Sequence, residues 1–158
     1  MSILEKKVDL LIELMTCSDQ ERRASIRDEL ISVSAPQVRT PRERVAEALR
    51  FVGVPCHLVG YPIFIEAVCL VLEDENIYRF KGAPGGLRAA LSQRLGGNLS
   101  SSAIERRMRN AVDFVWLHGD VEVINRVFGN SVSTQRAKPT SFQFVYTIAE
   151  YIRRSSRL

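Results

Sequence analysis

The chain has 158 residues, of which 46% are hydrophobic and 25% are charged, and a formal net charge of +4. This length suits one domain with a small appendage, and the composition is that of a globular protein with a buried core. No apolar run reaches the roughly 18 residues of a membrane helix. The acidic residues of MSILEKKVDLLIELM exclude a signal peptide. We therefore expect a cytoplasmic protein with no membrane association.

The cysteines and histidines do not suggest a catalytic or metal centre. Cys17, Cys56 and Cys69 are odd in number and lack the spacing of a zinc site or a disulfide framework. His57 follows Cys56 directly, but no third group is available to orient such a pair, and His118 lies far away in the sequence. We interpret the thiols as buried or inert, and we expect no enzyme activity, no cofactor and no metal ion.

The excess of positive charge lies after residue 50. Residues 1–50 carry nine basic and nine acidic side chains, whereas residues 51–158 carry thirteen and nine. Within residues 76–138 there are ten Lys or Arg residues against four acids. A local excess of this kind favours a polyanionic partner.

The first 34 residues predict two short amphipathic helices that form an αα-hairpin. The first has an apolar seam at spacings of four, three and four, made of Leu4, Val8, Leu11 and Met15. A capping box at residues 18–21 starts the second, with Ile26, Leu30 and Val33 on its apolar side. Because helices this short are unstable alone, we expect the seam to pack on the rest of the chain or on a second copy.

The stretch SVSAPQVR (32–39) is the predicted linker, which divides the chain into residues 1–39 and 40–158. The second part has capping boxes at residues 40–43 and 140–143. Apolar residues recur at helical spacing between them, and no strand pattern competes. The sequence therefore predicts an all-α fold.

The stretch SSSAIERRMRNAVDFVW (100–116) predicts a helix with an apolar and a polar side. At about 100° per residue, one stripe contains Ile104, Met108, Ala111 and Val115. The opposite side contains Ser102, Glu105, Arg106, Arg109 and Asp113. With the predicted helix 87–95 before it, this is the order of a helix-turn-helix, whose second helix enters the major groove. Arginine can bind guanine and glutamate can bind cytosine, but such residues also form ion pairs on solvated helices. Both interpretations stay open on the residue types alone.

Several separated stretches resemble a known family. They are VGVPCHLVGYPIFIEAV (52–68), IERRMRNAVDFVW (104–116), VINRVFGNSVS (123–133) and AKPTSFQF (137–144). Through them, residues 41–158 resemble the C-terminal DNA-binding effector domain of the master response regulator of sporulation initiation in endospore-forming bacteria. The resemblance implies a six-helix bundle that contains a helix-turn-helix, binds promoter DNA as paired copies on adjacent boxes, and acts on transcription.

The resemblance also implies which residues meet DNA. It makes 87–95 the first helix of the motif and 100–118 the recognition helix. It assigns base contact to Glu105 and Arg106, and it places Ser102 and Arg109 near the DNA backbone. It also implies that two loop residues, Arg136 and Lys138, contact the DNA phosphates. The full set of expected DNA-binding residues is Ser101, Ser102, Glu105, Arg106, Arg109, Arg136 and Lys138.

Three features depart from the family pattern. Ala103 stands where the family has an arginine, and the turn GGNLSSS is longer than expected. In the full regulator a phosphoacceptor receiver domain precedes the effector domain, whereas about forty residues with a helical pattern do so here. We therefore expect a regulator that is not controlled by phosphorylation of its own receiver.

The first hypothesis is a sequence-specific transcription regulator that binds double-stranded DNA as a homodimer. Residues 1–34 would dimerise or modulate it, and RNA polymerase sigma factor is a further candidate partner. The alternative is an interaction module that does not bind DNA and instead binds a related regulator or RNA polymerase through its helical surfaces. The Glu105–Arg106 pair and the basic excess favour the first, whereas Ala103 and the longer turn favour the second.

Overall fold

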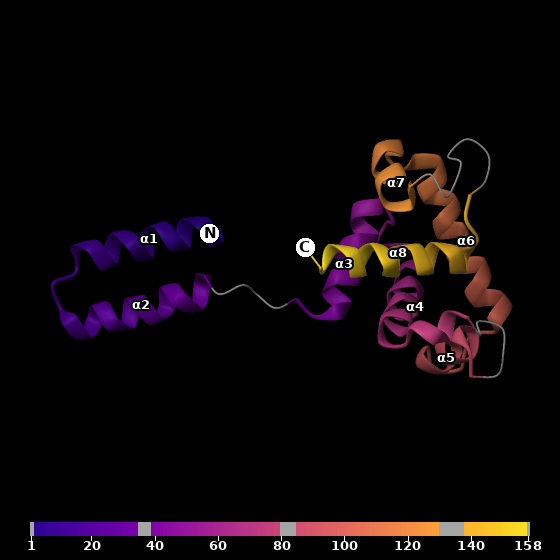
Figure 1. Ribbon diagram of the computed structural model, residues 1–158, viewed down its shortest axis with the longest axis horizontal. Helices are drawn as coiled ribbons and strands as arrows, with labels where there is room; N and C mark the ends of the chain where they lie inside the picture. The colour runs from indigo at the N-terminus through magenta and orange to yellow at the C-terminus, as the bar shows by residue number, and fades with distance from the viewer. Residues whose placement is uncertain (1, 35–38, 80–84, 130–137, 158) are drawn as a thin grey trace. The chain divides into compact units, whose positions relative to one another are not determined.

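The computed structural model describes residues 2–34, 39–79, 85–129 and 138–157 (Figure 1). The chain divides into two compact units, Met1–Val38 and Arg39–Leu158, which are called the hairpin unit and the effector unit below. Every regular element in the described ranges is helical, and these ranges contain no strand. The predicted all-α class is confirmed. Residues 35–38 of the predicted linker lie outside the described residues.

The hairpin unit consists of α1 (Ile3–Thr16) and α2 (Gln20–Ser34), which lie side by side and run in opposite directions (Figure 1). The predicted capping box begins one residue too early. Asp19, not Ser18, precedes the first helical residue, and its carboxylate accepts a hydrogen bond from the Glu21 N–H at 3.1 Å. Aspartate and serine are equally favourable N-cap residues. The sequence therefore predicts that a helix begins here but does not decide between Ser18 and Asp19 as its N-cap.

The effector unit is built around α4, whose sequence is almost continuously apolar. Helix α4 packs against α3, α5, α6 and α8 and contributes buried side chains on several of its sides, which suits a central helix. The elements of this unit are α3 (Pro41–Val52), α4 (Gly60–Glu73), a 3-10 turn η1 (Glu75–Tyr78), α5 (Leu87–Arg94), α6 (Ser101–His118), α7 (Val121–Phe128) and α8 (Ser141–Ser155). The η1 turn was not predicted.

Local signals account for the ends of the helices that flank the core. The hydroxyls of Thr40 and Thr140 accept hydrogen bonds from the N–H groups of Glu43 and Gln143, each at 3.2 Å, and both capping boxes are complete. Helix α3 ends at Gly53, whose φ of 99° is left-handed. The capping boxes predicted at residues 40–43 and 140–143 are confirmed.

Aromatic side chains join the helices in the core. The ring of Phe144 on α8 lies 5.0 Å from that of Phe64 on α4 and 5.2 Å from that of Phe128 on α7. Phe64 and Phe144 are fully buried. Rings at this separation add about 0.5–1.5 kcal/mol per pair to the free energy of burial. These contacts hold α8 and α7 on the central helix.

A close approach between backbones sets the position of α6 on α4. A β-carbon at Gly60 would lie 2.5 Å from the carbonyl oxygen of Arg107 and 3.1 Å from the β-carbon of Ala111. Such contacts are too short for any residue but glycine. The first turn of α4 therefore touches the middle of α6, and the N-terminal half of α6 projects beyond this contact.

Two sequence expectations concern the surface. Within the described ranges, no helix is both long enough and apolar enough to cross a membrane. Of the three thiols that we expected to be buried or inert, Cys69 is buried, Cys17 is partly buried and Cys56 is exposed.

Candidate nucleic-acid interface

Helices α5 and α6 are joined by a tight turn that depends on two glycines. Gly96 and Gly97 have φ values of 83° and 71°, a region that side chains with a β-carbon rarely adopt. The N–H of Gly97 donates to the carbonyl oxygen of Ser92 at 2.9 Å and so satisfies the end of α5. The predicted helix 87–95 is confirmed to within one residue, since α5 runs from Leu87 to Arg94.

Ser100 caps α6. Its hydroxyl accepts a hydrogen bond from the N–H of Ala103 at 3.2 Å and lies 3.1 Å from the hydroxyl of Ser102. The helix proper runs from Ser101 to His118. The three serines therefore form the cap and the first turn of α6.

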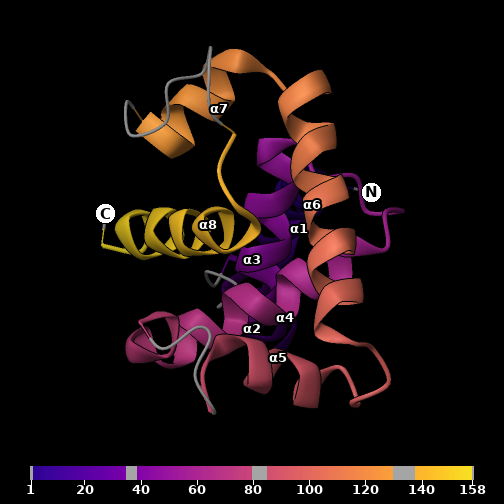
Figure 2. The same cartoon turned by 90° about the vertical axis from the view of Figure 1, so that its right-hand side faces the viewer.

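Helix α6 shows the predicted division into a buried and an exposed side. Figure 2 shows it along one side of the effector unit, with α5 at its N-terminal end and α7 at its C-terminal end. The buried residues are Ile104, Met108, Ala111, Val112 and Val115. The exposed residues of its first half include Ser101, Ser102, Arg106 and Arg109. The apolar stripe is thus confirmed, and it turns these four side chains away from the core.

Glu105 lies between two arginines. One of its carboxylate oxygens is 3.1 Å from a terminal nitrogen of Arg88 on α5, and the other is 3.5 Å from a terminal nitrogen of Arg109 one turn later on α6. The Glu105 side chain is 33% exposed, so solvent can still reach it. The ion pairing that the sequence left open as an alternative to base contact is thus present, between Glu105 and Arg109.

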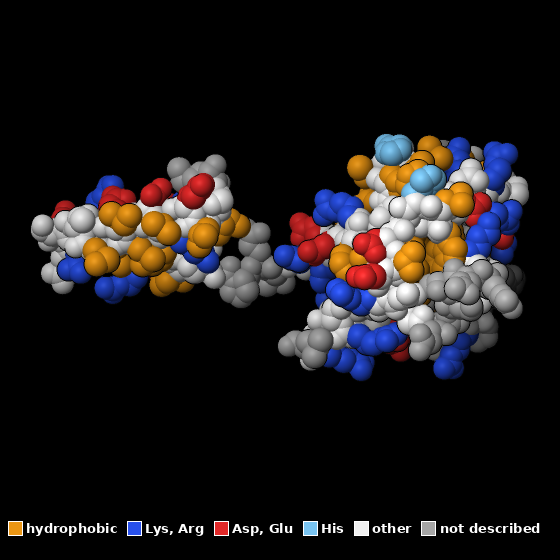
Figure 3. Space-filling view, turned by 90° about the horizontal axis from the view of Figure 1, so that it is seen from above, with side chains coloured by type: hydrophobic (Ala, Val, Ile, Leu, Met, Phe, Trp, Pro, Cys, Tyr) orange, Lys and Arg blue, Asp and Glu red, His pale blue; other side chains and the backbone are white. Residues whose placement is uncertain are grey.

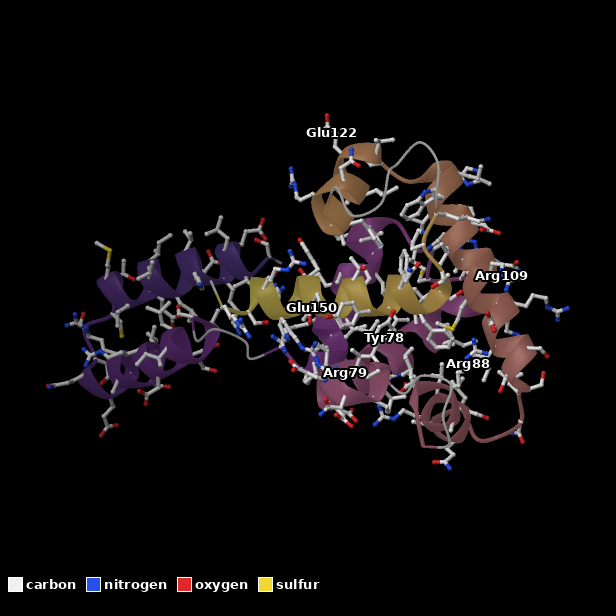
Figure 4. The ribbon with its side chains drawn as sticks, turned by 45° about the vertical axis from the view of Figure 1, so that its right-hand side comes forward. Tyr78, Arg79, Arg88, Arg109, Glu122 and Glu150 are labelled. Carbon is white, nitrogen blue, oxygen red and sulfur yellow. The ribbon has the colours of Figure 1, made fainter. Side chains whose placement is uncertain are left out.

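Arg88 is a residue that the sequence analysis missed. Its guanidinium lies 4.9 Å from the centre of the Phe142 ring on α8 while it also binds Glu105 on α6. A stacked arginine that donates to a carboxylate is held in one orientation. Figure 4 shows Arg88 and Arg109 on the α6 side of the effector unit. No local spacing links Arg88 to Glu105, so only tertiary structure brings them together.

Arg106 contrasts with its neighbours. It is exposed, and among the described residues it has no side-chain hydrogen bond or ion pair. Arg107, the next residue, is partly buried. A free guanidinium has five donors available for an acceptor outside the protein. Arg106 is therefore the α6 side chain best placed to bind a partner molecule.

The segment before α8 adds a further cation beside α6. The ammonium of Lys138 lies 2.5 Å from a carboxylate oxygen of Asp113. A groove of about 190 Å³ separates the two elements and is lined by Glu105, Arg109, Val112, Asp113, Lys138, Pro139, Thr140 and Ser141. Thr140 is the N-cap of α8, so the positive end of that helix dipole also faces this region. Arg136, the other predicted loop residue, lies outside the described residues.

The charge of this region is positive. Its described basic residues are Arg88, Arg106, Arg109 and Lys138, whereas its described acids are Glu105 and Asp113. Both acids are neutralised by pairing, Glu105 with two arginines and Asp113 with Lys138. The surface that remains attracts polyanions, and this attraction weakens with salt.

A comparison with protein families decides the broad class of the protein. The family described as Sporulation initiation factor Spo0A C terminal matches residues 45–152. The chain belongs to the Spo0A C-terminal family. Members of the Spo0A C-terminal family are DNA-binding effector domains that regulate transcription in sporulation, and the family is not one of enzymes. The match runs from α3 to α8 and includes α6 and the segment before α8, so the resemblance inferred from the sequence is confirmed.

Proposed function

We propose that the effector unit is a six-helix bundle whose α5 and α6 form a helix-turn-helix, and that it binds promoter DNA sequence-specifically to regulate transcription. The observation that carries this proposal is the exposed, unpaired Arg106 on the outer side of α6, in a chain of a DNA-binding family. The inner side of α6 is held by the core, so the helix enters a major groove as a rigid body.

The base contacts in this proposal come from Arg106 and Glu105. Arg106 donates two hydrogen bonds to O6 and N7 of a guanine, and Glu105 accepts one from N4 of a cytosine. Arg88 and Arg109 hold the Glu105 carboxylate before DNA arrives, which lowers the conformational entropy lost on binding. Arg88 thus acts as a positioning residue for a contact that it does not make itself.

The phosphate contacts come from the rim of the same surface. Ser101 and Ser102 lie in the first turn of α6, where free N–H groups and the helix dipole favour an anion. Arg109 and Lys138 supply positive charge along the adjoining DNA backbone. The resemblance adds Arg136, which lies outside the described residues, as a further phosphate contact. Such contacts position the helix on the duplex but do not distinguish one base sequence from another.

Ala103 limits the specificity that this surface can reach. It is partly buried at the first turn of α6 and has no polar group to offer to a base. With the family's arginine absent here, Arg106 carries a larger share of the discrimination between sequences. We therefore propose a shorter recognised sequence than that of relatives that keep the arginine.

Selection of bound oligonucleotides from a pool of random duplexes, followed by sequencing, tests the proposal. We expect an enriched motif with wild-type protein and none with the double variant Glu105→Ala and Arg106→Ala, which keeps the buried side of α6. If wild-type protein enriches no motif at low salt, the DNA-reading function is wrong. A stable complex with a related regulator or RNA polymerase would then support the alternative, an interaction module that does not bind DNA. The observation that favours this alternative is Ala103, which stands where the family has an arginine.

A further inference from the structure

The first turn of α8 leaves two backbone donors without a partner. Its capping box uses the N–H of Gln143, which donates to the Thr140 hydroxyl at 3.2 Å, and the N–H of Thr140, which donates to the Gln143 side chain at 2.9 Å. The N–H groups of Ser141 and Phe142 have no acceptor among the described residues. Because they lie at the positive end of the helix dipole, they are available to an anion.

The side chain of Ser141 is a second, independent sign of a ligand at this place. Ser141 is 7% exposed and is the one buried polar residue of the described chain. Its hydroxyl has no hydrogen-bond partner among the described residues, which is unfavourable for a buried polar group. The hydroxyl is still reachable, because among these residues the one side-chain polar atom that is fully enclosed without a partner is Nε of Arg44. Ser141 can therefore donate to a bound molecule.

These donors lie at the groove between α6 and α8. Ser141 lines this groove of about 190 Å³ together with Arg109 and Lys138. Figures 1 and 2 both show the N-terminal end of α8 beside α6. Pro139 is buried directly before the N-cap, and its ring restricts the backbone there. The donors of Ser141 are thus held in place before any ligand arrives.

The charges around the groove favour an anion, although two carboxylates line it. Glu105 pairs with Arg88 at 3.1 Å and with Arg109 at 3.5 Å. Asp113 pairs with Lys138 at 2.5 Å. Three cations against two carboxylates leave one positive charge, to which the dipole of α8 adds. Figure 3 shows Lys and Arg side chains, with acidic ones among them, along the right-hand edge of the effector unit, which is the side of α6 in Figure 1.

We propose that this groove binds one phosphate of the DNA backbone, and that Ser141 donates to it from both its hydroxyl and its N–H group. The inference rests on the proposed function, because the phosphate belongs to the strand beside the major groove that α6 enters. Arg109 and Lys138 supply charge, whereas Ser141 and Phe142 supply neutral donors of fixed direction. Such a contact fixes the position of α6 along the duplex but does not distinguish one base from another.

The substitution Ser141→Ala separates a binding role from a structural role. The free protein loses an unsatisfied hydroxyl, so its melting temperature should stay the same or rise slightly. The complex loses a hydrogen bond to a charged group, so every duplex should bind about tenfold more weakly. The slope of log K against log salt should not change, because a hydroxyl carries no charge, whereas Lys138→Ala should lower it by about one. Thermal unfolding and anisotropy titrations at several salt concentrations measure these quantities.

The matched control is Ser155→Ala, the same change at the opposite end of α8. Ser155 is exposed, and its hydroxyl donates to the carbonyl oxygen of Tyr151 at 2.9 Å. This variant should bind duplexes as the wild type does. Wild-type affinity in Ser141→Ala overturns the proposal, and so does a loss of affinity that comes with a lower melting temperature.

A second experiment identifies the phosphate. Single methylphosphonate substitutions in the selected duplex remove the charge of one phosphate at a time. We expect one position at which the substitution weakens binding of the wild type but has much less effect on Ser141→Ala, because both changes remove the same contact. Calorimetry with inorganic phosphate and no DNA tests the other source. Binding that Ser141→Ala abolishes, with no such position in the duplex, would show that a free phosphate occupies the groove and would overturn the assignment to DNA.

The outcome is separable from that of base recognition by α6. In our proposal sequence preference depends on Arg106, whereas Ser141→Ala should weaken the selected duplex and an altered duplex equally. If the wild type binds DNA with a sequence preference and Ser141→Ala has the same affinity, only the phosphate contact is wrong. If the wild type binds no duplex, the proposed function fails and the DNA phosphate contact fails with it.

Discussion

The hairpin unit and the effector unit use the same local signals but differ in what they bury. Ser2 and Glu5 form a capping box at the start of α1 as complete as that of Thr40 and Glu43 at the start of α3. Yet the described hairpin buries only Leu10 and Ile26, whereas the effector unit encloses a whole apolar helix, α4. Caps worth about 1 kcal/mol begin helices, but burial of apolar area keeps them folded.

The two units also use charge differently. In the hairpin unit, the pairs Lys6–Glu29 and Glu13–Arg22 join exposed side chains, so solvent screens them and they contribute little to stability. In the effector unit, Glu105 pairs with Arg88 and Arg109, and Arg106 beside it is unpaired among the described residues. The charges of this unit therefore form a surface that a partner can bind. The exposed surface available to a partner is therefore apolar in the hairpin unit and positively charged in the effector unit.

The largest expected effect contrasts the two cores. Phe144→Ala should lower the free energy of unfolding of the effector unit by about 3–5 kcal/mol, because Phe144 is fully buried against two other rings. Ile26→Ala should leave the unfolding of the effector unit unchanged, because Ile26 belongs to the other unit. Hydrogen exchange followed by mass spectrometry measures protection in each unit separately. A loss of effector protection in Ile26→Ala would show that the two cores are coupled.

The next effect contrasts exposed arginines of the two units. Arg106→Ala should cost about 1–3 kcal/mol of discrimination between the selected motif and a duplex with its guanine changed. Arg27→Ala in the hairpin unit and Arg126→Ala on α7 should leave this discrimination unchanged, although both residues are exposed. Fluorescence anisotropy titrations with the two duplexes measure it. Equal discrimination by wild type and Arg106→Ala would remove Arg106 from the recognition surface.

A smaller effect is expected at the phosphate contacts. Lys138→Ala should weaken binding to all duplexes and lower the slope of log K against log salt by about one. The loss of affinity should be modest, because part of the Lys138 charge already pairs with Asp113. Arg136→Ala is expected to act in the same way. Titrations at several salt concentrations separate this uniform loss from a change in sequence preference, which would argue for base contact instead.

The smallest effect concerns the thiols and leaves function unchanged. Cys56 is exposed and should react first with a disulfide reagent, Cys17 is partly buried and should follow, and Cys69 should react last. Burial also raises the pKa of the Cys69 thiol, so less of the reactive thiolate is present at a given pH. Reaction rates on single-cysteine variants measure the order, with unfolded protein as the control in which all three react alike. Fast reaction of Cys69 in folded protein would show that the core around α4 opens readily.

Much of the candidate interface could be predicted from the sequence because it depends on one helix. The spacing of Ile104, Met108, Ala111 and Val115 predicts which side of α6 is buried, and this follows from helix geometry alone. The exposure of Ser102, Arg106 and Arg109 follows from the same spacing. Errors at this level were small and local, such as the N-cap of α2, where Asp19 and Ser18 are adjacent and equally suitable.

The sequence by itself determined the helical class, the main helix ends and the two sides of α6, since hydrogen bonds and periodicity within a few residues decide these features. Only the tertiary structure decided that Arg88 holds Glu105, that Lys138 pairs with Asp113 and that the predicted apolar seam of α1 is left exposed by α2. These depend on how separate helices pack against one another, and packing is decided by the shape of the whole core. Arg106, which contacts DNA in our proposal, could thus be predicted from the sequence, whereas Arg88, which holds the neighbouring Glu105, could not.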